Sequence, residues 1–172
     1  MVFTRDEYFM HLAMAEGAKA AERGEIPVGA VIVRDGKVIA AAGNRRERDH
    51  SATAHAELMA ISKACEILGG WRLVGCELFV TLEPCPMCMG AIINARIPRV
   101  VFGAPDPKGG ACGGLFDMNS YPLNHHPEMV AGVLGNECAE MLRSFFRERR
   151  SGKGFDPAKA WRERRNQENL VK

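Results

Sequence analysis

The sequence predicts an α/β fold with three layers (α/β/α), in which helices cover both faces of a central mixed sheet of about five strands. Two observations lead to this prediction. Residues 28–33 and 37–42 are apolar, extended segments on either side of Asp35 and Gly36, a pair typical of hairpin turns. After this hairpin, helical and strand-like segments alternate along the chain. The length of 172 residues, 47% of them hydrophobic and 26% charged, is ordinary for one globular domain.

A capped helix precedes the hairpin, and a polar loop follows it. Thr4 and Glu7 have the spacing of a capping box, so we expect a helix from there to about Arg23, where Gly24 ends it. After the two hairpin strands, residues 43–51 form a polar loop that contains several arginines.

The remaining elements alternate between helix and strand. Thr53 is expected to cap a second helix, and Pro86 to open a third, because proline is favoured at the first helical position. Residues 103–127 form a loop with five glycines and four prolines, and a loop that long in a compact domain is usually functional. Asn136 is the expected cap of the last helix. The expected segments are helices over 54–68, from 86 onward and over 136–150, and strands over 77–82, 99–102 and 129–133.

Positive charge is concentrated at the C-terminal end. Residues 143–172 contain ten Lys or Arg against four Asp or Glu, whereas the whole chain carries a net charge of only +2. Such an asymmetry is typical of proteins with a polyanionic partner, although a solvated terminal helix has the same pattern. Glycines and a proline follow Arg150. We therefore expect one domain over residues 1–150 and a charged tail over residues 151–172.

Other features exclude several classes of protein. No apolar run approaches the ~20 residues of a membrane span, and the N-terminus lacks the pattern of a signal peptide. These observations predict a cytoplasmic protein with no membrane partner. Six cysteines are too sparse for a disulfide scaffold in a chain of 172 residues. Without a secretory signal, clustered cysteines more often bind metal or carry out redox chemistry, and only Cys85 and Cys88 are clustered.

Three residues have the types and the spacing of a catalytic zinc site. Cys85 and Cys88 are three positions apart at the start of an expected helix, so one helical turn directs both sulfurs toward the same point. A helix N-terminus also favours the thiolate forms that bind metal. His55, at the start of another expected helix, adds a third ligand. A catalytic zinc has three protein ligands and keeps its fourth position for water.

Glu57 stands two residues after His55 and is not assigned as a ligand. Beside a metal-bound water, whose pKa zinc lowers to about 7, its carboxylate can take up a proton and pass it to a substrate. The two motifs H-x-E and P-C-x-x-C together are the signature of zinc-dependent nucleobase deaminases.

Three other interpretations remain open for these residues. A C-x-x-C pair that opens a helix after a strand is also typical of thioredoxin-like redox enzymes, which would form a Cys85–Cys88 disulfide and bind no metal. A closed structural zinc site would use Cys112 or Cys138 as a fourth ligand, and the position of Glu57 would then be unexplained. A non-catalytic, zinc-stabilised nucleic-acid-binding module is the third interpretation.

Five motifs carry a resemblance to a known family: IPVGAV at 26–31, GNR at 43–45, TAHAE at 53–57, TLEPCPMCMGAI at 81–92 and VFGAPDPKGGA at 101–111. With them, the chain resembles the bacterial tRNA-specific adenosine deaminases of the cytidine deaminase-like superfamily. The resemblance covers about residues 4–150 and not residues 151–172, and Pro107 and Gly109 depart from the family's usual pattern. The zinc motif is common to the superfamily, whereas the adenosine-specific part rests mainly on residues 103–114.

The resemblance implies a cytidine deaminase-like fold and hydrolytic deamination of adenosine to inosine at the wobble position of a tRNA anticodon. Hydroxide on zinc would attack C6 of adenine, with Glu57 as the proton shuttle. Each subunit of a homodimer would bind one Zn2+ through His55, Cys85 and Cys88. The implied substrate-binding residues are Asn44, Pro27, Val28 and Ala56.

The resemblance also implies that the partner is a tRNA anticodon stem-loop, whose unstacked bases are the easiest to extrude. Basic side chains near the motifs and at the C-terminal end can contact its phosphates, although any one of them can equally be a solvated surface residue. The candidates for RNA contact are Arg45, Arg46, Asp106, Lys108, Arg149 and Arg150. A deaminase of a free base, guanine or cytosine, is the nearest alternative, because such enzymes have the same zinc motif.

Overall fold

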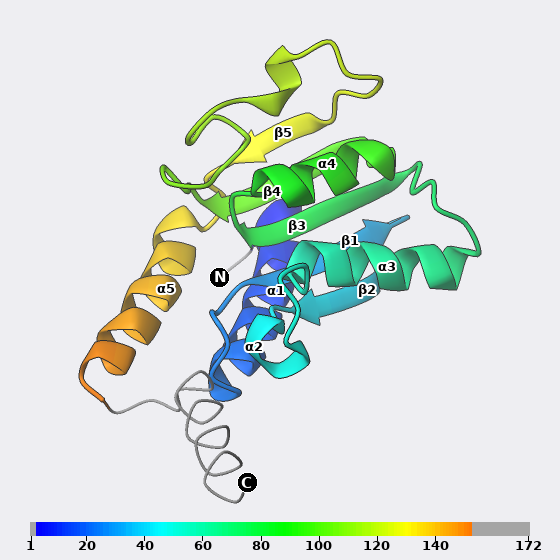
Figure 1. The fold of residues 1–172 in the computed structure, drawn as a ribbon. Coiled ribbons are helices and arrows are strands. Elements are labelled where there is room, and N and C mark those ends of the chain that lie inside the picture. The colour runs from blue at the N-terminus through cyan, green and yellow to red at the C-terminus, as the bar shows by residue number, and fades with distance from the viewer. Residues whose placement is uncertain (1–2, 153–172) are drawn as a thin grey trace, which may run out of the picture.

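The computed structural model describes residues 3–152, in which five strands form one mixed sheet (Figure 1). The strands are β1 (Gly29–Arg34), β2 (Lys37–Gly43), β3 (Cys76–Leu82), β4 (Arg99–Ala104) and β5 (Glu128–Ala131). Their order across the sheet is β2-β1-β3-β4-β5. β1 is antiparallel to both β2 and β3, whereas β3, β4 and β5 run parallel. The predicted mixed sheet is confirmed.

The described helices cover both faces of this sheet (Figure 1). α3 (Ala56–Leu68) and α4 (Pro86–Asn94) pack on one face, and α1 (Arg5–Glu22) and α5 (Gly135–Arg150) pack on the other. α2 (Arg46–Asp49) is a single turn after β2, and a 3-10 turn (Met118–Ser120) lies between β4 and β5. The predicted three-layer α/β/α architecture is therefore confirmed.

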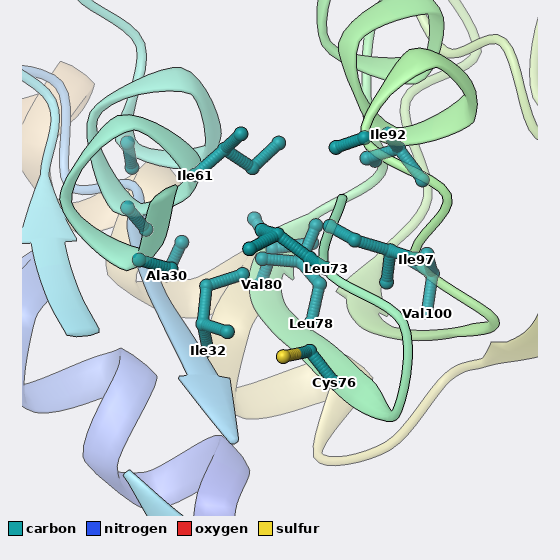
Figure 2. Close-up of a cluster of buried hydrophobic side chains, with 14 of the residues drawn as sticks. Ala30, Ile32, Ile61, Leu73, Cys76, Leu78, Val80, Ile92, Ile97 and Val100 are labelled. Atoms are coloured by element: carbon teal, nitrogen blue, oxygen red, sulfur yellow. The ribbon is translucent and has the colours of Figure 1, made fainter. Parts of the chain in front are cut away.

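The inner strand β1, which lies between β2 and β3, is buried on both faces because helices cover both. Ala30 and Ile32 face α3 and α4 and pack in a hydrophobic cluster with Val80 of β3 (Figure 2). Val31 and Val33 belong to a second cluster, which lies between the sheet and the helices α1 and α5. This burial on alternate sides explains why the strand is an unbroken apolar run in the sequence.

α1 approaches β1 and β2 closely at two glycines. A Cβ atom on Gly29 would lie 2.0 Å from the backbone carbonyl oxygen of Ala13, and one on Gly43 would lie 2.7 Å from that of Glu16. Only glycine leaves room for the helix backbone at such distances. α1 therefore packs directly against the start of β1 and the end of β2. The residues next to these two glycines, Val28 and Asn44, line a pocket.

Three local predictions were wrong. Thr53 does not cap α3: its hydroxyl pairs with that of Ser51 at 3.1 Å, and the N-cap residue is His55. Asn136 lies inside α5, which begins after Leu134 in the left-handed conformation. The polar segment after β2 contains the helix α2 rather than only loop. The capping box at the start of α1, in contrast, is confirmed.

The predicted division into a domain and a tail stays a prediction. α5 ends at Arg150, and residues 153–172 of the predicted tail lie outside the described residues. None of the helices in residues 3–152 has both the length and the apolar character needed to cross a bilayer.

We expect Gly29→Ala to destabilise the protein, because the added methyl group would have to displace the backbone of α1. Overpacking typically costs about 1–3 kcal/mol of unfolding free energy, which urea unfolding can measure. Gly70→Ala is the matched control, since a Cβ atom there has no neighbour within 4 Å. Equal stability of the two variants would contradict the close contact between α1 and β1.

Candidate active site

The three predicted metal ligands come together from the starts of two helices. His55 is the N-cap residue of α3, Cys85 is the N-cap residue of α4, and Cys88 lies in the first turn of α4. Nδ1 of His55 lies 3.7 Å from Sγ of Cys85 and 3.5 Å from Sγ of Cys88. Both helices lie on the same face of the sheet and begin at the edge where β3 ends (Figure 1). The predicted ligand cluster is confirmed.

These distances fit a zinc ion. Zinc binds sulfur at about 2.3 Å and imidazole nitrogen at about 2.0–2.1 Å, so that tetrahedral bonding separates the two donor atoms by about 3.6 Å. The observed nitrogen–sulfur distances of 3.7 and 3.5 Å agree with that separation. In the described residues, no fourth His, Cys, Asp or Glu donor joins this group. A zinc ion with three protein donors keeps one position for water, as in catalytic sites.

The two thiols differ in their affinity for a proton. The hydrogen bond from Cys88 and the contact with His55 lower the pKa of Cys85 to about 4, although burial acts in the opposite direction. The same hydrogen bond and burial raise the pKa of Cys88 far above its usual range. Cys85 is therefore a thiolate at neutral pH, as a helix N-terminus favours. Cys88 keeps its proton until a metal ion displaces it.

Glu57 lies in the first turn of α3 and lines the same pocket as His55 and Cys85. Its side chain is only 4% exposed. Burial raises the pKa of the Glu57 carboxyl to about 6, and the neighbouring His55 only partly offsets this effect. A carboxyl group with such a pKa can gain and lose a proton near neutral pH, as a general acid–base catalyst must.

A small pocket adjoins these residues. Its volume of about 160 Å³ is below the ~300 Å³ at which pockets for drug-sized ligands begin, so it suits one small ring system. The lining residues are Ile26, Val28, Asn44, Arg46, His55, Glu57, Leu82, Glu83, Cys85 and Asp106. The pocket thus joins two of the metal ligands to four of the predicted contact residues, namely Val28, Asn44, Arg46 and Asp106.

The predicted contact residues outside this pocket are Pro27, Ala56, Arg45, Lys108, Arg149 and Arg150. Pro27 and Arg149 line a second cavity, about 420 Å³ in volume, between α1 and α5. Ala56 is fully buried in the core, and Arg45 forms an ion pair of 2.9 Å with Asp49. Lys108 and Arg150 are exposed. Their contacts with substrate or RNA stay predictions.

Sequence reasoning missed Glu25, a carboxylate that is 1% exposed. It accepts hydrogen bonds from the side-chain amide of Asn44 (3.3 Å) and from the backbone N–H groups of Glu47 (3.3 Å) and Arg48 (2.8 Å). Glu25 therefore orients Asn44 and satisfies the first amides of α2, which explains why a helix forms in the predicted loop. No local signal marks this role, because the partners lie 19 to 23 residues further along the chain.

Glu83 was missed as well. It lines the pocket, is 3% exposed, and accepts hydrogen bonds from three backbone N–H groups between residues 106 and 114. Its place two residues before Cys85 was the available signal, but a motif of residue types does not reveal backbone partners more than twenty residues away.

The structure does not support the closed or redox alternatives. Cys138 lies in the hydrophobic cluster on the opposite face of the sheet, where burial raises its pKa to about 11. Sγ of Cys112 lies 3.7 Å from the sulfur of Met89, and burial raises its pKa to about 12. Neither cysteine joins the group of metal donors in the described residues. Cys85 and Cys88 form no disulfide, and the sulfur atoms of both lie near the same histidine.

We expect the zinc affinity of metal-stripped protein to rise with pH, because the Cys88 thiol must lose its proton before its sulfur binds metal. Release of one proton per ion corresponds to about a tenfold rise per pH unit. Calorimetric titration in buffers of different ionisation enthalpy counts the released protons.

The control for this titration is Cys112→Ala, which should bind one zinc ion with unchanged affinity. Loss of zinc in that variant would favour the closed, structural site. A titration without proton release would instead contradict the protonation state assigned to Cys88.

Comparison with known proteins agrees with this site. Residues 3–104 match the cytidine and deoxycytidylate deaminase zinc-binding region. The tRNA-specific adenosine deaminase of Bacillus subtilis (strain 168) is 52% identical over 151 residues, which cover 87% of this chain and 94% of that protein. A structure from a study of A-to-I editing by tRNA deaminases at the wobble position of transfer RNA has a TM-score of 0.75 and 49% identity, covering 78% of this chain and 99% of the other.

A guanine deaminase from Nitrosomonas europaea is more distant in sequence. It has a TM-score of 0.70 at 26% identity, covering 84% of this chain and 86% of its own. The fold is thus shared with proteins named for different purines, and the matches of 52% and 49% identity are to tRNA deaminases. The chain belongs to the cytidine and deoxycytidylate deaminase zinc-binding family and, within it, to the tRNA-specific adenosine deaminases.

Proposed function

We propose that this protein deaminates adenosine to inosine at the wobble position of a tRNA anticodon, by hydrolysis that releases ammonia. One observation carries the proposal: the buried carboxylate of Glu57 lines one small pocket together with His55 and Cys85 of a three-donor metal site. They do so in a chain that is 52% identical to a tRNA-specific adenosine deaminase over 151 residues. When His55, Cys85 and Cys88 hold zinc, the ion lowers the pKa of a water molecule to about 7 and so supplies the nucleophile.

Glu57 moves the protons that the reaction requires. Addition of water to C6 of adenine removes a proton from the water and places one on N1. A carboxylate oxygen of Glu57 accepts and delivers this proton, since its pKa of about 6 lies close to neutral pH. Glu57 then carries the proton of the new hydroxyl group to the amino nitrogen. The C6–N bond breaks, ammonia leaves, and the base is hypoxanthine with a carbonyl group at C6.

The pocket holds one base that has left the stack. Ile26 and Val28 provide apolar walls, and the Asn44 amide, oriented by Glu25, contacts the nucleoside. The volume of about 160 Å³ leaves the sugar and the flanking nucleotides outside. An anticodon loop suits this requirement, because its bases are not locked in a duplex and cost little to extrude.

Basic side chains in the pocket and elsewhere on the surface contact the phosphates of the loop. Arg46 lines the pocket from the start of α2, Lys108 is exposed in the segment after β4, and Arg150 is exposed at the end of α5. Phosphate contacts of this kind hold an RNA in place without reading its sequence. The basic Arg45 and Arg149 and the acidic Asp106 are the other candidates for contact with the RNA.

We further propose that the protein is a homodimer and that it acts in the cytoplasm. The dimer is supported by the resemblance to the family and by Met87, a large apolar side chain on the exposed side of α4 beside the metal site. The cytoplasm is the compartment in which a bacterial tRNA is modified.

Deamination of free guanine is a second candidate, supported by the TM-score of 0.70 to a guanine deaminase. An assay with an anticodon stem-loop, free guanine and free cytosine separates the two, with ammonia release and mass-spectrometric detection of inosine as readouts. Turnover of guanine without inosine formation would overturn the tRNA proposal. Absence of ammonia from all three would leave a non-catalytic zinc protein.

We expect Glu57→Gln to lower kcat for the stem-loop by at least about 100-fold, because general acid–base groups typically contribute 10²–10⁴-fold. The amide has the shape of the carboxyl group but cannot carry the proton. Zinc content, measured by atomic emission, should stay at one ion per chain. Full activity in this variant would exclude Glu57 as the proton carrier.

We expect Arg46→Ala and Arg150→Ala each to weaken stem-loop binding and to flatten its salt dependence. Removal of one phosphate-binding side chain should reduce the slope of log Kd against log salt concentration by about 0.7. Lys37→Ala is the charge-matched control, because Lys37 opens β2 at the end of the hairpin away from the pocket. An arginine variant with the wild-type slope in anisotropy titrations would show that the side chain contacts no phosphate.

A further inference from the structure

Glu83 is a buried acid that neither binds metal nor moves protons in the reaction above. It follows the last residue of β3 and precedes Cys85 by two positions. Its Oε2 accepts a hydrogen bond from the backbone N–H of Asp106 (2.8 Å). Its Oε1 accepts hydrogen bonds from the N–H groups of Cys112 (2.9 Å) and Gly114 (2.8 Å). One carboxylate therefore binds both ends of the segment 106–114.

The segment is shaped around this carboxylate. A Cβ atom on Gly110 would lie 2.3–2.5 Å from the carboxyl atoms of Glu83, and one on Gly114 would lie 2.4 Å from Oε2. At both positions a side chain would occupy the space that the carboxylate fills. Two backbone bonds add to the attachment: Glu83 N–H donates to Ala104 (2.8 Å), and Ala111 N–H donates to the carbonyl of Pro84 (2.9 Å).

This attachment reaches the pocket. Asp106 and Glu83 both line it, together with the metal ligand Cys85. The carboxylate of Asp106 in turn accepts hydrogen bonds from the N–H groups of Lys108 (3.0 Å) and Gly109 (3.1 Å). The wall formed by this segment therefore depends on where Glu83 places the Asp106 backbone.

We propose that Glu83 is a positioning residue: its carboxylate is the template for residues 106–114 and fixes that wall of the pocket relative to the metal site. A buried carboxylate is well suited to this, because hydrogen bonds from N–H groups to a charged acceptor are stronger than neutral ones. Glu83 thus governs substrate binding rather than the chemical step. The inference rests on the proposed function for its kinetic readout.

Glu83→Gln tests the template directly. A glutamine has the same shape but offers one carbonyl oxygen, and its NH2 group cannot accept from an N–H group. If that carbonyl oxygen keeps the hydrogen bonds from the N–H groups of Cys112 and Gly114, the N–H group of Asp106 loses its acceptor. We expect KM for the stem-loop to rise at least tenfold, kcat to change less than threefold, and zinc content to stay at one ion per chain. Amide hydrogen exchange at Asp106 should accelerate at least tenfold.

Gly110→Ala perturbs the contact between Glu83 and the segment 106–114 from the side of the segment, and it should also raise KM. Because both changes break one interaction, the double variant should have a KM close to that of the more severe single variant. Gly70→Ala, with no neighbour within 4 Å of its Cβ, is the control and should have wild-type KM and kcat.

Wild-type KM and wild-type exchange at Asp106 in the zinc-loaded Glu83→Gln protein would overturn the proposal. Equal loss of kcat and zinc would also overturn it, since Glu83 would then support the metal site rather than the loop. If Glu83→Gln fails to fold, the KM and exchange of Gly110→Ala decide. If wild-type protein fails to deaminate the stem-loop, the proposed function fails, while the exchange comparison still tests the template.

Discussion

The convergence of two helix starts on one metal site is the constraint on which the rest of this structure depends. His55 and Cys85 occupy N-cap positions, yet neither side chain makes a capping hydrogen bond. A capping side chain typically contributes about 1 kcal/mol to stability. Here the side chains of His55 and Cys85 belong to the group of metal donors instead. Metal binding can offset the loss, because it stabilises the folded state that holds the ligands. α3, α4 and the end of β3 must therefore keep their relative positions.

Three buried carboxylates surround the pocket, and their partners separate their roles. Glu25 and Glu83 each accept hydrogen bonds from backbone N–H groups of a segment distant in the sequence. Because each carboxylate is held by backbone N–H groups of one segment, Glu25 and Glu83 fix the position of the segments that form the pocket walls. Glu57 is buried with its pKa raised to about 6, which leaves it able to exchange a proton.

The chemistry of the site could be predicted from the sequence, but its walls could not. Cys85 and Cys88 lie one helical turn apart, so local geometry alone brings their sulfurs together. The alternation of apolar segments likewise predicted the strands and the layers. Glu25 and Glu83 escaped prediction because they are held by backbone N–H groups 22 to 31 residues away, and every residue type except proline has such a group. The sequence did not predict α2 because the acceptor for its first N–H groups is Glu25, more than twenty residues earlier in the chain.

Pro107 and Gly109 fit the geometry of the wall that Glu83 holds. Asp106 begins a turn in which its carboxylate accepts from the N–H groups of Lys108 and Gly109, and its carbonyl accepts from Gly110 at 2.9 Å. Proline is favoured directly after the first residue of such a turn, because its fixed φ fits and no N–H is needed there. Glu83 binds only backbone groups of this segment. The side chains at positions 107 and 109 therefore take no part in the hydrogen bonds that hold this segment to Glu83.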